Sequence, residues 1–138
     1  HGFGFKTRVN TNGHGSLYYG RNIAPELKGK IDSVNVSLNA PDARLYGEVC
    51  KPQIEGAFEA MLSFAQCCKR AGLNCWFSVV DCIGRDQVEA CKKLADAAEI
   101  PLRVRIKQES RKLLSALVFI CEEGRSLAFS MCKRERIR

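Results

Sequence analysis

The chain has 138 residues, enough for one domain with a hydrophobic core but too few for a closed eight-stranded barrel of roughly 250 residues. Its formal net charge of +7 is unevenly distributed. Residues 1–102 contain 12 basic and 11 acidic side chains, whereas residues 103–138 contain 10 basic and 4 acidic ones. This basic end has no aromatic platform and no nucleic-acid-reading motif, so its charge indicates a solvated tail and does not favour nucleic acid as a partner.

The first predicted elements are a strand over residues 5–10 and a helix over residues 22–30. The strand alternates in polarity and puts Arg8 and Asn10 on one side. The helix has Asn22 as a candidate cap, Pro25 near its first turn and a glycine near its end.

The second predicted strand is the most informative one. Val34, Val36 and Leu38 alternate with Asn35, Ser37 and Asn39. Helices on both sides in sequence would cover the apolar face, and the polar face would then line a crevice or barrel lumen that holds a polar ligand.

Two more helix-strand pairs follow. Apolar residues at spacings of three and four predict helices over 57–71 and 86–98. Residues 75–81 are rich in bulky β-formers around a lone Ser78, and residues 102–106 alternate apolar side chains with Arg103 and Arg105. The order β-α-β-α-β-α-β predicts an α/β fold of four parallel strands with a ligand site at their carboxyl ends.

The eight cysteines do not have the spacing of a metal site or of a disulfide framework. We expect Cys68 and Cys91 to be small core residues, and so many unpaired thiols indicate a reducing, cytoplasmic location. No segment is long and apolar enough to be a transmembrane helix; residues 113–121 are a candidate docking segment.

Six segments in order carry a resemblance to a known family. They are R-V-N-T-N-G-H-G (8–15), G-R-N with P-E-L (20–27), D-S-V-N-V-S-L-N-A-P-D (32–42), G-A-F-E-A (56–60), S-V-V-D with I-G (78–84) and I-P-L-R-V-R (100–105). This pattern resembles the small radical S-adenosylmethionine (radical SAM) proteins associated with TatD-type nucleases.

The resemblance implies that residues 1–105 are the C-terminal part of a partial (β/α)6 radical SAM barrel, incomplete at the N-terminal side, and that residues 106–138 are a basic tail outside the resemblance. It also implies S-adenosylmethionine as cofactor. Family members hold a [4Fe-4S] cluster in a C-x-x-x-C-x-x-C loop, and this motif is absent from the chain. The expectation is therefore an adenosine-binding part of the pocket without enzymatic competence of its own; the alternative is a small open α/β module that binds nucleotides or a partner without redox chemistry.

The predicted cofactor-binding residues are Asn12, Ser37, Asn39, Ser78 and Arg103. Asn12 is a ligand contact or a turn cap, while Ser37 and Asn39 suit ribose hydroxyls. Ser78 either contacts the ribose or methionyl carboxylate or fills space. Arg103, with Arg105, either holds a substrate anion or pairs with Asp81 or solvent; the latter is favoured.

Two further expectations concern His14 and the sheet edge. A lone histidine in a loop is usually exposed to solvent, so His14 is not favoured as a catalytic group. The first strand would leave its outer backbone groups unpaired, and this predicts self-association through the edge or its coverage by residues 113–121. The substrate is not readable from the sequence.

Overall fold

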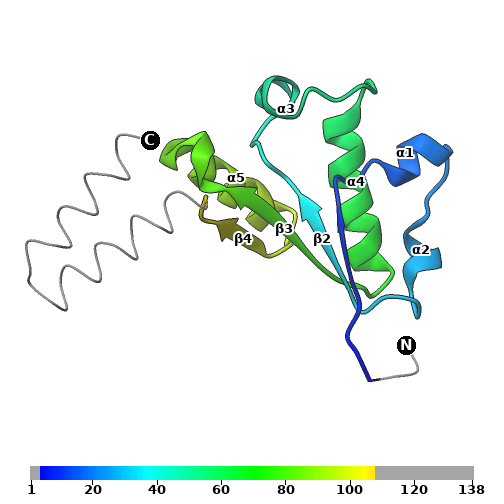
Figure 1. Ribbon diagram of the computed structural model, residues 1–138. Coiled ribbons are helices and arrows are strands. Elements are labelled where there is room, and N and C mark those ends of the chain that lie inside the picture. Colours follow the sequence, from blue (N-terminus) through cyan, green and yellow to red (C-terminus); the bar gives the residue numbers. More distant parts are fainter. Residues whose placement is uncertain (1–3, 108–138) are drawn as a thin grey trace, which may run out of the picture. The chain divides into compact units, whose positions relative to one another are not determined.

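Four parallel strands form one sheet whose spatial order follows the chain (Figure 1). The computed structural model describes residues 4–107, and the strands are β1 (Arg8–Thr11), β2 (Ser33–Ser37), β3 (Asn74–Val80) and β4 (Leu102–Arg105). Each strand pairs in parallel with the next. The predicted α/β class with a four-stranded parallel sheet is therefore confirmed.

The strand register divides the sheet into an apolar and a polar face. Val36 pairs with Phe77 and Phe77 with Leu102, so these apolar side chains share one face. On the other face the strands contribute two rows of polar or aromatic side chains: Asn10, Asn35 and Trp76 in one, and Ser37, Ser78 and Arg103 in the next.

The apolar face packs against two helices, α4 (Ala57–Arg70) and α5 (Arg85–Ala97). Their buried side chains recur at helical spacing, and the cluster that they form with the strands includes Met61, Ala65, Cys68, Cys91 and Ala95. Cys68 and Cys91 are fully buried, as predicted from the apolar stripes. Both long helices therefore pack on the apolar face of the sheet.

The short helices α1 (Gly15–Tyr19) and α2 (Ala24–Leu27) lie against α4 (Figure 1). The predicted helix over residues 22–30 is wrong in length, because Lys28 is already extended at φ −61° and ψ 130°. Neither α1 nor α3 (Ala43–Cys50) was predicted. Both are too short for their apolar residues to establish a clear helical period.

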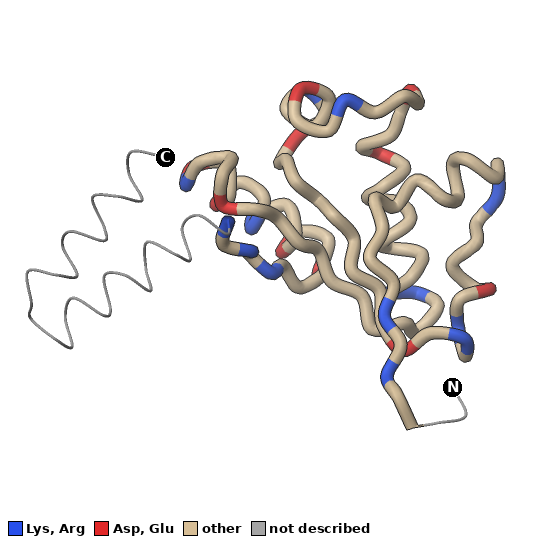
Figure 2. Tube along the Cα trace, viewed as in Figure 1, with Lys and Arg blue, Asp and Glu red and all other residues tan. Residues whose placement is uncertain are grey.

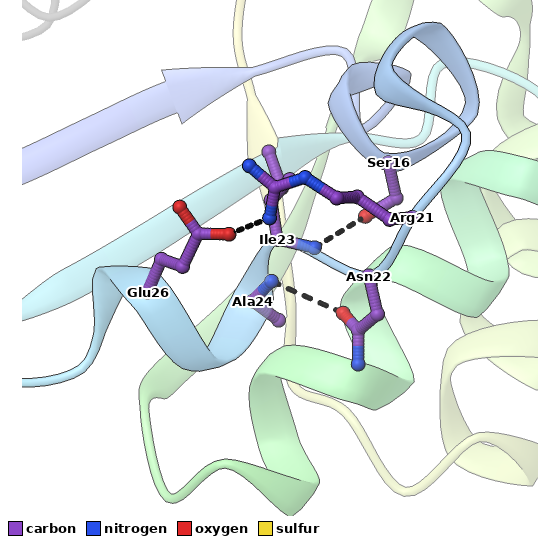
Figure 3. Close-up of polar contacts among 6 residues, drawn as sticks. All are labelled: Ser16, Arg21, Asn22, Ile23, Ala24 and Glu26. Atoms are coloured by element: carbon purple, nitrogen blue, oxygen red, sulfur yellow. Dashed lines mark hydrogen bonds and ion pairs between the residues drawn. The ribbon is translucent and has the colours of Figure 1, made fainter.

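Local hydrogen bonds fix the connection between α1 and α2 (Figure 3). The Ile23 backbone amide donates to the Ser16 hydroxyl at 3.2 Å, and the Ala24 amide donates to the Asn22 side-chain oxygen at 3.1 Å. An exposed ion pair joins Arg21 to Glu26 across the same turn. Asn22 therefore stabilises the turn before α2 but is not its N-cap, which is Ile23; the expectation of a cap at Asn22 is wrong by one residue.

The strand β1 lies at one edge of the sheet and begins later than predicted. Before it, the Asp32 carboxylate accepts hydrogen bonds from the Thr7 amide at 2.6 Å and from the Thr7 hydroxyl at 3.0 Å. Phe5, just upstream, is 79% exposed. The outer side of β1 has no partner strand among residues 4–107.

The structure also bears on membrane spans, on the cysteines and on the basic tail. Within residues 4–107, no helix is sufficiently long and apolar to span a membrane. The six cysteines in this part of the chain are free. The predicted tail over residues 106–138, including the segment 113–121, lies outside the described residues except for its first two positions.

Candidate functional site

A cavity of about 590 Å³ lies where β1 and β2 end. Ligands bind to parallel α/β sheets at this carboxyl edge, because the loops that follow the strands converge there. The described residues that line the cavity are Asn12, His14, Ser37, Asn39, Tyr46 and residues 49–54. Three of the five predicted site residues, Asn12, Ser37 and Asn39, are therefore brought together.

Asn12 follows β1 directly and stabilises the turn after it. Its side-chain oxygen accepts a hydrogen bond from the His14 amide at 3.1 Å. The turn-capping interpretation is thus correct, but it uses only the oxygen. The two N–H donors of the Asn12 amide have no recorded partner among the described residues and lie at the cavity.

Gly13 makes this turn compatible with the core. Its φ of +77° lies in the left-handed region, and a Cβ at this position would lie 3.1 Å from the Met61 Cα and 3.2 Å from a Val36 methyl carbon. Both the backbone conformation and the close approach of α4 therefore require glycine. The loop that carries Asn12 and His14 is held against the sheet by this contact.

Ser37 and Asn39 approach the cavity from the end of β2. Ser37 is half-buried, and its hydroxyl forms no recorded hydrogen bond within the described chain. Asn39 has φ +58°, a left-handed conformation that asparagine tolerates better than most residues. Its amide nitrogen lies 3.8 Å from the Cys50 sulfur, which orients the side chain toward α3.

A hydrogen bond between His14 and Tyr46 closes one side of the cavity. The His14 Nε2 atom is 2.8 Å from the Tyr46 hydroxyl, and the two rings meet edge to face with centroids 6.0 Å apart. Tyr46 is almost fully buried and also packs against Phe58. The expectation of an exposed His14 is wrong, because the loop after β1 folds onto α3.

Burial changes the protonation behaviour of both rings. It lowers the pKa of His14, which favours the neutral imidazole. It raises the pKa of Tyr46 to about 12, with a smaller contribution from Cys50. At neutral pH this pair therefore presents an uncharged imidazole and an uncharged phenol to the cavity.

The lining is rich in neutral donors and acceptors. Among the described lining residues, Lys51 carries a charge and none is a carboxylate. Lys51 ends α3 with φ +45°. Such a wall suits a polar, uncharged or partly anionic small molecule.

The other two predicted site residues, Ser78 and Arg103, do not line this cavity. They are register partners on β3 and β4. Ser78 is 1% exposed, and its hydroxyl has no hydrogen-bond partner among residues 4–107. Arg103 is exposed, and its guanidinium carbon lies 4.0 Å from the centroid of the Trp76 ring. The favoured prediction was that Arg103 pairs with Asp81 or is exposed to solvent, and Arg103 is exposed.

The sequence reasoning missed Tyr46, Cys50 and Lys51 because it missed α3. One local signal was present: Asp42 caps this helix by accepting from the Leu45 amide at 2.8 Å. An aspartate three residues before an apolar residue is a typical helix start.

Among the described residues, no group of three or more histidine, cysteine or acidic side chains is arranged to hold a metal ion. Comparison of the chain with protein-family models, with curated proteins and with solved structures gives no match. The site is therefore interpreted from its own geometry.

Proposed function

We propose that residues 4–107 are an adenosine-binding unit and that the cavity at the ends of β1 and β2 takes the nucleoside part of S-adenosylmethionine. One observation carries this proposal: Asn12, Ser37 and Asn39, three of the residues predicted from the sequence to bind the cofactor, line one cavity. Its volume of about 590 Å³ lies within the range of small-molecule sites.

The lining offers the chemistry that a nucleoside needs. The Ser37 hydroxyl can both donate to and accept from a ribose hydroxyl, and the Asn39 amide offers a second donor and acceptor. The N–H donors of Asn12, which have no recorded partner among residues 4–107, can donate to acceptors on the ligand from the loop after β1. Apolar side chains at Val49 and Ile54 give a purine a surface against which to pack.

The topology supports a relationship to the radical SAM barrel. Consecutive strands are parallel neighbours in the order β1-β2-β3-β4, and the helices pack on one face. This arrangement is the one that successive β/α units adopt in a barrel wall, with the polar face toward the lumen. The finer assignment, a partial (β/α)6 radical SAM barrel, is part of the proposal.

The side chains present do not fit a [4Fe-4S] cluster. Such a cluster needs preorganised thiolates, and neither the sequence motif nor a suitable cluster of ligands among residues 4–107 is found. We therefore derive no redox step. The role assigned to this part of the chain is to bind and orient the adenosine group.

Calorimetric titration of the full chain with adenosine and with 2′,3′-dideoxyadenosine tests the proposal. Loss of a buried hydrogen-bond partner costs about 1–3 kcal/mol, so the dideoxy compound should bind roughly five- to a hundredfold more weakly. Ser37→Ala should weaken adenosine binding by a similar factor and should reduce the difference between the two ligands.

Two further variants sharpen this test. Asn39→Gly removes the side chain while keeping the left-handed backbone. Ser63→Ala, at an exposed position of α4, is the matched control and should bind as the wild type does. Equal affinity of the wild type for both nucleosides would show that no ribose hydroxyl is recognised and would refute the proposal.

A further inference from the structure

The polar face of the sheet carries positive charge with no strand carboxylate to neutralise it. By register, the strands place Arg8, Arg103 and Arg105 on this face and no aspartate or glutamate. Arg103 and Arg105 form no recorded ion pair within residues 4–107. Figure 2 shows the basic positions following one another along β4.

Arg103 is held in a defined place. Its guanidinium lies over Trp76, 4.0 Å from the ring centroid, and its N–H donors have no recorded acceptor within residues 4–107. Its register partner Ser78 is 1% exposed and has an unpartnered hydroxyl. On the same face, the Asn35 side-chain oxygen is also buried without a partner.

Buried polar groups without partners are uncommon in folded proteins, because each has lost its hydrogen bonds to water. Here such a hydroxyl stands beside an arginine that lacks an acceptor. A group with several acceptor oxygens and a negative charge satisfies both at once.

We infer that β3 and β4 carry an anion subsite, in which Arg103 binds a phosphate or carboxylate group and Ser78 donates a second hydrogen bond. The subsite is separate from the nucleoside cavity, which Ser78 and Arg103 do not line. The anion draws the guanidinium from the face of Trp76 toward its own oxygens. Arg105, two residues along the same face of β4, adds to the attraction without being the main contact.

Trp76 is a built-in reporter, since the chain contains one tryptophan. Full-length protein is titrated with inorganic phosphate and, separately, with citrate, at constant ionic strength set with chloride. Tryptophan emission and calorimetry are recorded together. We expect saturable binding by both methods; saturation with phosphate alone identifies a phosphoryl ligand, and saturation with citrate as well identifies a general anion subsite.

The variants locate the binding. Arg103→Gln should weaken it at least tenfold, and Arg103→Lys, which keeps the charge but loses the planar fork, should weaken it severalfold. Arg70→Gln, at an exposed arginine on α4 that bonds Gln66, is the control and should leave it unchanged. Adenosine binding should be the same in Arg103→Gln as in the wild type, so failure of the subsite is distinguishable from failure of the nucleoside cavity.

Ser78→Ala provides a readout that a purely structural role would not give. Removing an unsatisfied buried hydroxyl should leave the urea midpoint unchanged or raised, yet it should weaken anion binding about five- to tenfold. The inference is overturned if neither anion binds saturably below ~10 mM, or if Arg103→Gln binds both anions as the wild type does.

Discussion

The hydroxyl of Tyr46 and the Nε2 atom of His14 are 2.8 Å apart, and this hydrogen bond ties α3 to the loop after β1. Two segments 32 residues apart thereby form one wall of the cavity. Tyr46→Phe removes the hydroxyl and keeps the ring.

We expect Tyr46→Phe to lower the free energy of unfolding by about 1 kcal/mol, because a part-buried hydrogen bond is lost. Urea denaturation followed by circular dichroism measures this. Tyr18→Phe is the control, because Tyr18 is 76% exposed and should change stability little. If the two variants have equal midpoints, the His14–Tyr46 bond does not stabilise the fold.

The lowered pKa of His14 predicts a pH dependence of stability. Burial favours the neutral ring, so the folded pKa lies below the ordinary value of 6.5. The unfolded chain then takes up a proton first as the pH falls through 6.5, and the stability contributed by neutral His14 is lost below that point.

The measurement is the difference in unfolding free energy between the wild type and His14→Gln as a function of pH. Wild-type stability should fall relative to that of the variant as the pH drops from about 7.5 to about 5.5. Parallel curves over this range would contradict a half-buried, neutral His14.

A comparison of Gly13 with Gly20 distinguishes the two reasons for a glycine, a left-handed backbone and a lack of space for a Cβ atom. Both have positive φ, but a Cβ at Gly13 would contact Met61 and Val36, whereas a Cβ at Gly20 would have no described atom within 4 Å outside its chain neighbours. Gly13→Ala should therefore be the more destabilising, by roughly 1–3 kcal/mol beyond Gly20→Ala. Thermal unfolding of both variants decides this, and equal losses would mean that α4 does not pack on this turn.

The outer edge of β1 has no partner strand within residues 4–107, and we expect it to pair with a second chain. Unpaired backbone groups at a sheet edge can pair with a second chain, and Phe5 beside this edge is 79% exposed. Sedimentation velocity at micromolar concentrations should detect dimers or larger species. Phe5→Lys should shift the distribution toward monomer and Tyr18→Lys should not; a wild type that stays monomeric at ~100 µM would refute pairing between chains and leave coverage of the edge by residues 113–121.

The sheet and the two long helices could be predicted from the sequence, and the reason is physical. Alternation at Val34, Val36 and Leu38 and the stripe through Met61 and Ala65 reflect burial on one face, which periodicity records directly. The turn-capping role of Asn12, one of the two alternatives left open, is also a local signal, because Asn before Gly is typical of a turn.

Contacts between distant segments were not predictable in the same way. His14 is half-buried because α3 packs beside its loop, and no feature near His14 in sequence indicates that. Likewise, Ser78 and Ser37 share a face and neighbouring strands, but one lies enclosed and the other lines the cavity. The two serines are register partners, so it is the packing around each of them, and not register or residue type, that separates their environments.

The most direct test of the adenosine site is residue-resolved binding. Amide ¹H–¹⁵N NMR spectra of the full chain, titrated with adenosine, should shift progressively and saturably at Asn12, Ser37 and Asn39, while amides on α5 remain in place. Ser37→Ala should need a roughly five- to hundredfold higher adenosine concentration for the same shifts. Saturable shifts confined to other parts of the chain, or no shifts at all, would contradict an adenosine site at the ends of β1 and β2.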